Sequence, residues 1–170
     1  MNFFADKLNS MEDLFFHEIE DLYDAEQRLV EALPTMAEAA TSPRLKQAIN
    51  QHRGQTEQHV QRLINIFQEF GKTPEGTTCR GMRGLIAEGE GIVSLEGDRD
   101  VKDAALIGAA QRVEHYEIAA YGTARTFAQR LGYQQAVTLL QTTLDEETAT
   151  DKELTAIAEE SVNLAAQHAG

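Results

Sequence analysis

The stretch RVEHYEIAAY, residues 112–121, has the periodicity of a helix but carries acids where a helix that only packs would carry Leu or Ala. Glu117 lies on the inward-facing line of this helix, and Glu114 lies one turn earlier on the same side. An unpaired carboxylate costs several kcal/mol to bury, or it takes up a proton. The stretch therefore predicts a helix whose buried face needs partners for its acids.

Long segments with helical periodicity surround this stretch, and sparse Pro and Gly residues separate them. Ser10 and Ser42 are placed to cap two of the helices, with Pro43 at the first helical position of the second one. Pro34 falls inside the first helix and predicts a kink or a restart. The predicted helices cover residues 10–40, 43–70, 100–131 and 134–166. Such lengths are typical of four-helix bundles.

The segment between the second and third helices, residues 71–100, is long for a linker in a compact domain. It is rich in Gly and contains one short apolar stretch, residues 82–95. We expect it to run the length of the bundle, so that the third helix begins at the far end. One long crossover between two antiparallel hairpins is the ferritin-like connection. The sequence therefore predicts an all-α, ferritin-like four-helix bundle that forms a single domain over residues 1–170.

All four helices share one pattern, because the inward-facing line of each is apolar at both ends and polar in the middle. The polar positions are Glu26, His52, Thr56, His59, Glu114, Glu117, Glu147 and Asp151. The rise per residue of a helix is fixed, so counting from the turns places Glu26 opposite His59. The same count places Glu117 opposite the segment between Glu147 and Asp151. These polar positions are therefore expected to meet at mid-bundle.

Carboxylates that meet in a dry core repel one another strongly unless cations lie between them. Bound divalent cations resolve the conflict, and carboxylate oxygens together with imidazole suit iron or manganese. The candidate metal ligands are Glu26, His52, His59, Glu114, Glu117, Glu147 and Asp151. We do not expect His52 and His59 to bind the same ion, because they lie about two turns apart. Of the two, His59 is the better candidate, because its height along the bundle matches that of Glu26.

A second interpretation needs no metal. A buried Glu is often paired with Arg or hydrogen-bonded to Tyr, and four such residues lie near in the sequence: Arg112, Arg125, Tyr116 and Tyr121. Some charged residues are expected outside the ligand layer, either on solvated faces or beside the ligands. These are His17, His115, His168, Asp145 and Glu146.

The composition of the 170 residues excludes several classes of protein. A formal net charge of −13 opposes binding to the phosphate backbone of a nucleic acid. No apolar run of about 18 residues is present to span a membrane, and residues 1–15 lack the pattern of a signal peptide. The single cysteine, Cys79, rules out an internal disulfide framework and fits a reducing compartment. The expected location is the cytoplasm.

Two further hypotheses concern association and redox chemistry. Apolar residues in excess of what one narrow core needs predict a homodimer with symmetric contacts. They are Phe3, Phe4, Phe15, Phe16 and the stretch 82–95. Cys79 is a candidate redox residue if Arg80 and Arg83 lower its pKa, although an isolated cysteine beside an apolar stretch is more often simply packed.

Five segments resemble the YciE/YciF-type ferritin-like proteins of bacteria, and the resemblance extends over nearly the whole chain. They are DLYDAEQRL (21–29), HRGQTEQHVQRL (52–63), TTCRGMRGLIAEG (77–89), RVEHYEIAAYGT (112–123) and LDEETATDKEL (144–154). The resemblance implies a ferritin-like bundle, often dimeric, with a dinuclear metal site and a link to stress responses. Carried over by position, Glu26 matches the first-helix ligand of ferritin-like di-iron proteins, and Glu114 or Glu117 matches the third-helix ligand.

Two helices depart from the ferritin-like ligand pattern, in which each would supply Glu-x-x-His. The second helix carries Thr56 three residues before His59, and Gln55 where relatives often carry Glu. The fourth helix has Asp151, not His, after Glu147. These departures leave the number of bound ions open.

Two functions follow from the sequence. The first is a dinuclear non-haem iron or manganese protein that handles peroxide or O₂ under stress, with Tyr23 and Tyr121 beside the ligands. The second is a structural or interaction protein in which any metal only stabilises the bundle.

Overall fold

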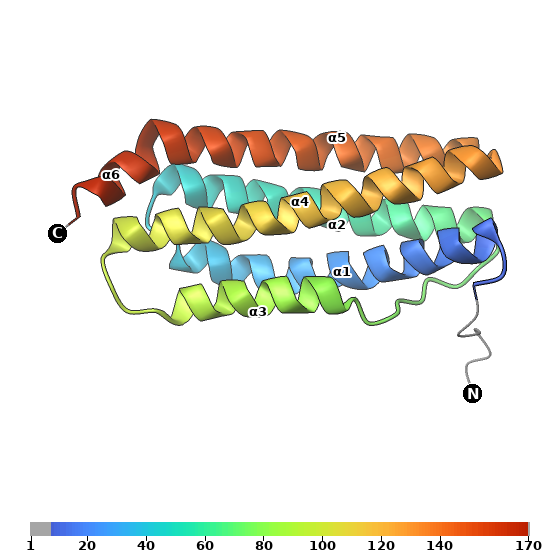
Figure 1. Ribbon diagram of the computed structural model, residues 1–170, viewed down its shortest axis with the longest axis horizontal. Coiled ribbons are helices and arrows are strands. Elements are labelled where there is room, and N and C mark those ends of the chain that lie inside the picture. Colours follow the sequence, from blue (N-terminus) through green and yellow to red (C-terminus); the bar gives the residue numbers. More distant parts are fainter. Residues whose placement is uncertain (1–7, 170) are drawn as a thin grey trace.

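A computed structural model describes residues 8–169, and these residues form a bundle of long helices that contains no strand (Figure 1). The helices are α1 (Met11–Ala39), α2 (Pro43–Glu69), α3 (Arg80–Ser94), α4 (Arg99–Leu131), α5 (Gln134–Ile157) and α6 (Asn163–Gln167), with a π-helical turn, Ala158–Val162, between the last two. α1 and α2 form one antiparallel hairpin, and α4 and α5 form the other. The predicted all-α bundle of two hairpins is confirmed.

Local sequence signals set most of the helix ends. The Ser10 hydroxyl accepts a hydrogen bond from the Asp13 amide at 3.0 Å, and Ser42 caps α2 with Pro43 at its first position. Gly132 ends α4 in the left-handed conformation, at φ 77°. The restart considered at Pro34 does not occur, because α1 continues through it to Ala39.

The crossover contains a helix that the sequence analysis did not predict. α3 lies alongside α1 and α4, and α4 begins at the end of the bundle where α1 ends (Figure 1). Cys79 caps α3, since its Sγ accepts from the Met82 amide at 3.3 Å. At Gly81 a Cβ atom would lie 2.6 Å from the Tyr116 ring of α4, so only glycine allows this approach. Gly81 thus permits close packing of α3 against α4, whereas a Cβ atom at Gly84 or Gly91 would meet nothing within 4 Å.

The core has two apolar clusters with polar residues between them. One cluster packs toward the α1–α2 turn around Leu33, Leu45 and Leu106, and the other packs toward the opposite end around Phe15 and Phe67. The buried polar residues are Glu26, His52, Thr56, His59, Asp103, Glu114, Glu117, Thr143, Glu147 and Thr150. The predicted polar layer at mid-bundle is therefore present.

Asp103 is a buried acid outside this layer. Its carboxylate accepts hydrogen bonds from the Thr41 amide at 2.9 Å, the Thr41 hydroxyl at 2.8 Å and the Ser42 amide at 2.6 Å. These bonds tie the α1–α2 turn to the first turns of α4 and account for this acid without any ligand.

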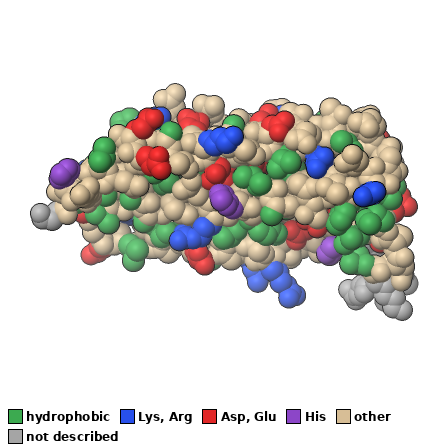
Figure 2. Space-filling model, turned by 45° about the horizontal axis from the view of Figure 1, so that its top comes forward, with side chains coloured by type: hydrophobic (Ala, Val, Ile, Leu, Met, Phe, Trp, Pro, Cys, Tyr) green, Lys and Arg blue, Asp and Glu red, His purple; other side chains and the backbone are tan. Residues whose placement is uncertain are grey.

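The apolar residues expected at a dimer contact do not all lie on the surface. Phe15 and Phe16, expected to contribute to a dimer contact, are buried in the chain's own core, while Phe3 and Phe4 lie outside the described residues. No helix within residues 8–169 has the length and apolar character needed to cross a membrane. Figure 2 shows acidic and basic side chains interspersed on the face that it presents, without a broad basic patch on that face.

Candidate metal centre

Two groups of buried side chains in the polar layer have their ligand atoms within 4.8 Å of one another. The His59 group consists of Glu26, His59 and Glu147, and the His52 group consists of His52, Glu114, Glu117 and Glu147. Glu147 belongs to both groups. Four helices contribute, because α1 supplies Glu26, α2 both histidines, α4 two acids and α5 the shared one.

The shared acid presents one oxygen to each histidine. Oε1 of Glu147 lies 2.9 Å from Nδ1 of His59, and Oε2 lies 3.8 Å from Nδ1 of His52. The two imidazole rings are 6.4 Å apart between centroids. His52 and His59 were not expected to bind the same ion. The structure agrees with this expectation, because each histidine belongs to a different group.

Charge attraction organises the His59 group. Nδ1 of His59 lies 3.4 Å from Oε1 of Glu26, and that oxygen also accepts a hydrogen bond from the Tyr121 hydroxyl. Burial lowers the pKa of His59, but the nearby carboxylates of Glu147 and Glu26 outweigh it and raise the pKa to about 10. His59 is therefore a cation at neutral pH.

Desolvation dominates the His52 group. Burial, together with the charge of Glu147, raises the pKa values of Glu114 and Glu117 well above the usual range. Burial lowers the pKa of His52, whose Nε2 lies 3.3 Å from Oε1 of Glu114. Without a cation, His52, Glu114 and Glu117 favour their neutral forms. Burial also raises the pKa of the shared Glu147, but the hydrogen bond and charge of His59 outweigh it and lower that pKa.

Several buried atoms of the two groups have no hydrogen-bond partner. They are Oε2 of Glu26, Nε2 of His52, Nδ1 of His59, Oε2 of Glu114, and both carboxylate oxygens of Glu117 and of Glu147. Nδ1 of His59 is in this set although it lies 2.9 Å from Oε1 of Glu147. A native interior rarely leaves so many polar atoms unpaired in one place. Their convergence is the pattern expected of metal ligands.

The arginine pairing considered as the alternative is not found among the residues that the structure describes. Within residues 8–169, neither Arg112 nor Arg125 forms an ion pair with a core acid, and Arg112 is exposed. Of the tyrosines considered, Tyr121 donates to Glu26, whereas Tyr116 donates to Asp21. In the described part of the chain, no side chain pairs with either carboxylate oxygen of Glu117.

Glu146 was expected on a solvated face, and the structure corrects this. Its Oε2 lies 2.8 Å from Nε2 of His59 and 2.5 Å from a guanidinium nitrogen of Arg62. Burial raises the pKa of Glu146, but the hydrogen bonds from Arg62 and His59 outweigh it and lower the pKa. Arg62 was also missed, although its position one turn after His59 was an available signal. Asp145 is exposed, as expected.

Asp151 lies beside the centre, but it belongs to neither of the two ligand groups found among the described residues. The buried line of α5 passes through Thr143, Glu147 and Thr150, so Asp151 is turned one position away. It accepts from Gln111 at 3.1 Å and lies 3.2 Å from Nε2 of His115. Steps of three and four residues both keep a helical face, which is why the sequence alone did not separate Thr150 from Asp151.

The remaining candidates lie away from the ligands. His17 and His168 are exposed, as expected, and Tyr23 packs edge-on against Phe67 at 5.8 Å without a bond to the centre. The proposed reactive thiol at Cys79 is corrected: the side chain is buried, and burial raises its pKa. Its Sγ lies 3.0 Å from the Tyr116 hydroxyl, so it packs the crossover against α4.

Fold and centre together define a class, the ferritin-like bundles with a buried layer of Glu and His between two hairpins. Residues 10–167 match the family described as a domain of unknown function (DUF892), and the chain belongs to this family. It is 41% identical to Protein YciF of Escherichia coli (strain K12) over 162 residues, which cover 95% of this chain and 98% of that protein.

Solved structures show the same likeness. The crystal structure of the E. coli stress protein YciF superimposes with a TM-score of 0.88 at 41% identity, covering 92% of this chain and 99% of that one. YcfI of Rhodopseudomonas palustris gives a TM-score of 0.88 at 40% identity, with the same coverage. A protein of Xanthomonas campestris, 19% identical with a TM-score of 0.74 over 93% of this chain and 97% of that one, shares the fold.

Proposed function

We propose that the chain is a stress-related metalloprotein that binds two ions of iron or manganese at mid-bundle and handles peroxide or O₂. The observation that carries this proposal is the position of Glu147, whose two oxygens face two separate ligand groups. A carboxylate placed this way can be shared by two ions. The unpartnered oxygens of Glu117 give further support, because nothing else in the described chain compensates their burial.

Each group supplies ligands of the type that iron and manganese accept. Glu26, His59 and Glu147 would hold one ion, and His52, Glu114, Glu117 and Glu147 would hold the other. Ions bound there would supply electron transfer to and from oxygen species. Asp151 remains a candidate ligand only if its side chain gives up the hydrogen bond from Gln111 and turns to an ion.

Neighbouring residues position the ligands and hold protons. Glu146 and Arg62 fix the ring of His59 from its outer nitrogen, which leaves Nδ1 facing the centre. The Tyr121 hydroxyl donates a hydrogen bond to Glu26. It keeps its proton, because burial raises the pKa of Tyr121 well above the usual value. These contacts orient the His59 group before any ion arrives.

A structural role is the second candidate function. The R. palustris relative is described, provisionally, as a structural protein. In this chain α2 offers Thr56 at a position where a carboxylate would be expected, and its hydroxyl bonds to the backbone oxygen of His52. A bundle protein of this kind would bind metal for stability and turn over nothing.

Metal analysis and turnover separate the two functions. The protein is purified without chelator, its iron, manganese and zinc content per chain is measured, and it is then reloaded anaerobically with Fe²⁺ or Mn²⁺. The proposal expects two ions per chain and catalytic loss of hydrogen peroxide or O₂. Metal without turnover would favour the structural role. Failure to bind either ion at saturating concentration would contradict the proposal.

We also propose that the protein is a homodimer. Phe15 and Phe16 no longer support this, so the support rests on the exposed apolar side chains Leu95 and Val101 beside the α3–α4 connection. Light scattering at micromolar concentration should give twice the chain mass. A monomeric mass would contradict it.

A further inference from the structure

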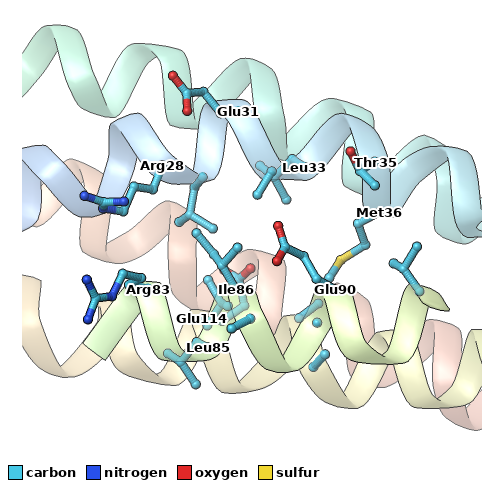
Figure 3. A pocket seen from close by; sticks show the side chains of 18 residues that line it. Arg28, Glu31, Leu33, Thr35, Met36, Arg83, Leu85, Ile86, Glu90 and Glu114 are labelled. Carbon is cyan, nitrogen blue, oxygen red and sulfur yellow. The ribbon is translucent and has the colours of Figure 1, made fainter. Parts of the chain in front are cut away.

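A pocket of about 440 Å³ lies between α1, α3 and α4 (Figure 3). Its outer part carries side chains of both charges, with Arg28 and Glu31 from α1 and Arg83 and Glu90 from α3. Glu31, Arg83 and Glu90 are exposed, so this side of the pocket reaches solvent. Arg28 forms a salt bridge with Asp24 at 2.6 Å. This leaves one cation, Arg83, and two anions, Glu31 and Glu90, so the mouth does not favour an anionic ligand.

The walls behind this mouth are apolar. They are formed by Leu29, Leu33, Met36, Ile86, Val93, Ala109, Ala110 and Val113. Gly89 of α3 is buried among them, and a Cβ atom there would lie 3.4 Å from the end of the Met36 side chain. A side chain larger than alanine at this position would therefore extend toward Met36 and into the lining of the pocket.

Glu114 forms the inner limit of the pocket and is also a member of the His52 group. Figure 3 shows it behind Ile86, on α4, across the pocket from Leu33 of α1. Its Oε2 is buried and has no hydrogen-bond partner among residues 8–169. Glu114 is thus shared between the lining of this pocket and the candidate metal centre.

The size of the pocket exceeds what O₂ or peroxide needs. Its volume of about 440 Å³ compares with about 30 Å³ for one water and lies in the usual range of about 300–1,000 Å³ for organic ligands. Apolar walls favour an alkyl or aromatic body. The carboxyl group of Glu114 in the lining favours a ligand whose inner end carries an O–H donor.

We infer that this pocket binds an elongated, uncharged and largely apolar organic molecule whose terminal O–H group donates to Glu114, as a primary alcohol or an alkyl hydroperoxide would. The inference rests on the proposed function, because it names the class of molecule that reaches the metal centre. The shared chemistry of the two compounds is the alkyl chain with a terminal O–H.

The test uses 1-octanol as an unreactive probe and the full-length protein loaded with diamagnetic Zn²⁺, because iron or manganese would broaden the NMR signals of methyl groups beside the centre. Nuclear Overhauser effects between the probe and the methyl groups of Leu33, Ile86 and Val113 locate the bound chain, and a titration gives its Kd. Gly89→Leu fills the pocket and also favours the helix, since Gly is a poor helix former. Gly84→Leu is the matched control, because a Cβ at Gly84 meets nothing within 4 Å and Gly84 does not line the pocket.

We expect saturable binding with these three contacts in the wild type and in Gly84→Leu, and a Kd weaker by about tenfold or more in Gly89→Leu. Methyl octyl ether, which keeps the chain but lacks the O–H donor, should bind about tenfold more weakly than 1-octanol. Octanoate should also bind more weakly, because its charge would meet Glu114. Equal binding by Gly89→Leu, contacts at other methyl groups, or no saturable binding would overturn the inference.

Two readouts keep this result separate from the proposed function. Metal content is measured on the same samples and should be unchanged in Gly89→Leu. Metal binding without octanol binding contradicts the pocket alone, and octanol binding by a protein that takes up no metal contradicts the proposed function alone. Turnover of octyl hydroperoxide, with 1-octanol as a competitive inhibitor, then distinguishes the hydroperoxide from the alcohol as the natural class.

Discussion

The two ligand groups share Glu147 but are prepared in different ways. In the His59 group, a protonated imidazole lies between acids, and Glu146, Arg62 and Tyr121 hold the side chains in place. In the His52 group, neither carboxylate oxygen of Glu117 has a hydrogen-bond partner among the described residues, and burial raises the pKa of Glu117. The protein itself therefore holds the His59 group in place, whereas the His52 group needs a proton or a cation to compensate its buried acids.

This difference separates the roles of acids that look alike in the sequence. An acid paired with His59 stabilises the fold without metal, because removing it strands a buried positive charge. An acid of the His52 group destabilises the metal-free fold whenever it ionises. The same change from Glu to Gln should therefore have opposite effects on stability in the two groups, while it reduces metal binding in both.

The largest effect is expected from Glu147→Gln, which alters both groups at once. Metal content should fall from two ions per chain to nearly none. The metal-free variant should lose about 3 kcal/mol of unfolding free energy, since His59 keeps its charge and loses the carboxylate that lies 2.9 Å from its Nδ1. Metal analysis and chemical denaturation measure the two effects. Glu153→Gln, an exposed acid on the same helix, is the control and should change neither.

Glu117→Gln should remove metal from the His52 group while leaving the metal-free fold unharmed. The folded-state pKa of Glu117 is raised, so its stabilising contribution is complete below about pH 4.5 and is lost as pH rises through the folded-state value. Gln does not suffer this loss. The metal-free variant should therefore equal the wild type at pH 5 and exceed it at pH 8. Clear destabilisation in a denaturation curve at pH 8 would show that Glu117 has a cationic partner instead.

Glu146→Gln should weaken the His59 group without removing a ligand. The variant keeps the shape of the side chain but loses the charge that fixes the outer nitrogen of His59. Metal affinity should fall by about 10- to 100-fold, as for other contacts that orient a metal-bound histidine. A competition titration with a chelator measures this, and two ions should still bind at saturation. An unchanged affinity would mean that Arg62 and the packing of α2 orient the ring unaided.

The smallest effect is a pH-dependent shift in melting temperature. The raised pKa values of Glu114 and Glu117 make the metal-free protein lose stability above about pH 4.5, and the pKa of about 10 at His59 adds a loss between pH 6.5 and 10. Mn²⁺ at 100 times its Kd should raise the melting temperature at pH 7 by roughly 5 °C or more. The rise should be smaller at pH 5, where protons compete for the ligands. Equal shifts at both values would indicate binding elsewhere.

Sequence reasoning worked where one rule determines one outcome. Ser10, Ser42 and Gly132 end helices by local hydrogen bonding and backbone conformation, which no distant contact overrides. The level of Glu26 against His59 followed from a constant rise per residue and a short turn. Both predictions needed no knowledge of tertiary packing.

The errors arose where tertiary contacts decide. α3 was read as linker because its four glycines disfavour a helix by about 1 kcal/mol each, and only the ring of Tyr116 explains Gly81. Glu146 was assigned to solvent because the neighbouring Glu147 already occupied the inward position. Its bond to His59 depends on how α5 is rotated against α2. Rotation of one helix about its axis also separates Thr150 from Asp151, and periodicity does not determine it to one residue.

The crossover between the hairpins also has a consequence for the order of folding events. Glu26 and His59 lie on adjacent helices of the first hairpin, so their contact is local in the chain, whereas both ligand groups need Glu147 from the second. Each hairpin can form through short-range contacts before the two halves dock. A metal ion that needs both hairpins would then bind after the rate-limiting barrier, so it should slow unfolding and leave the folding rate nearly unchanged. In a cell under stress, such an ion would lengthen the lifetime of the folded chain without helping it to fold.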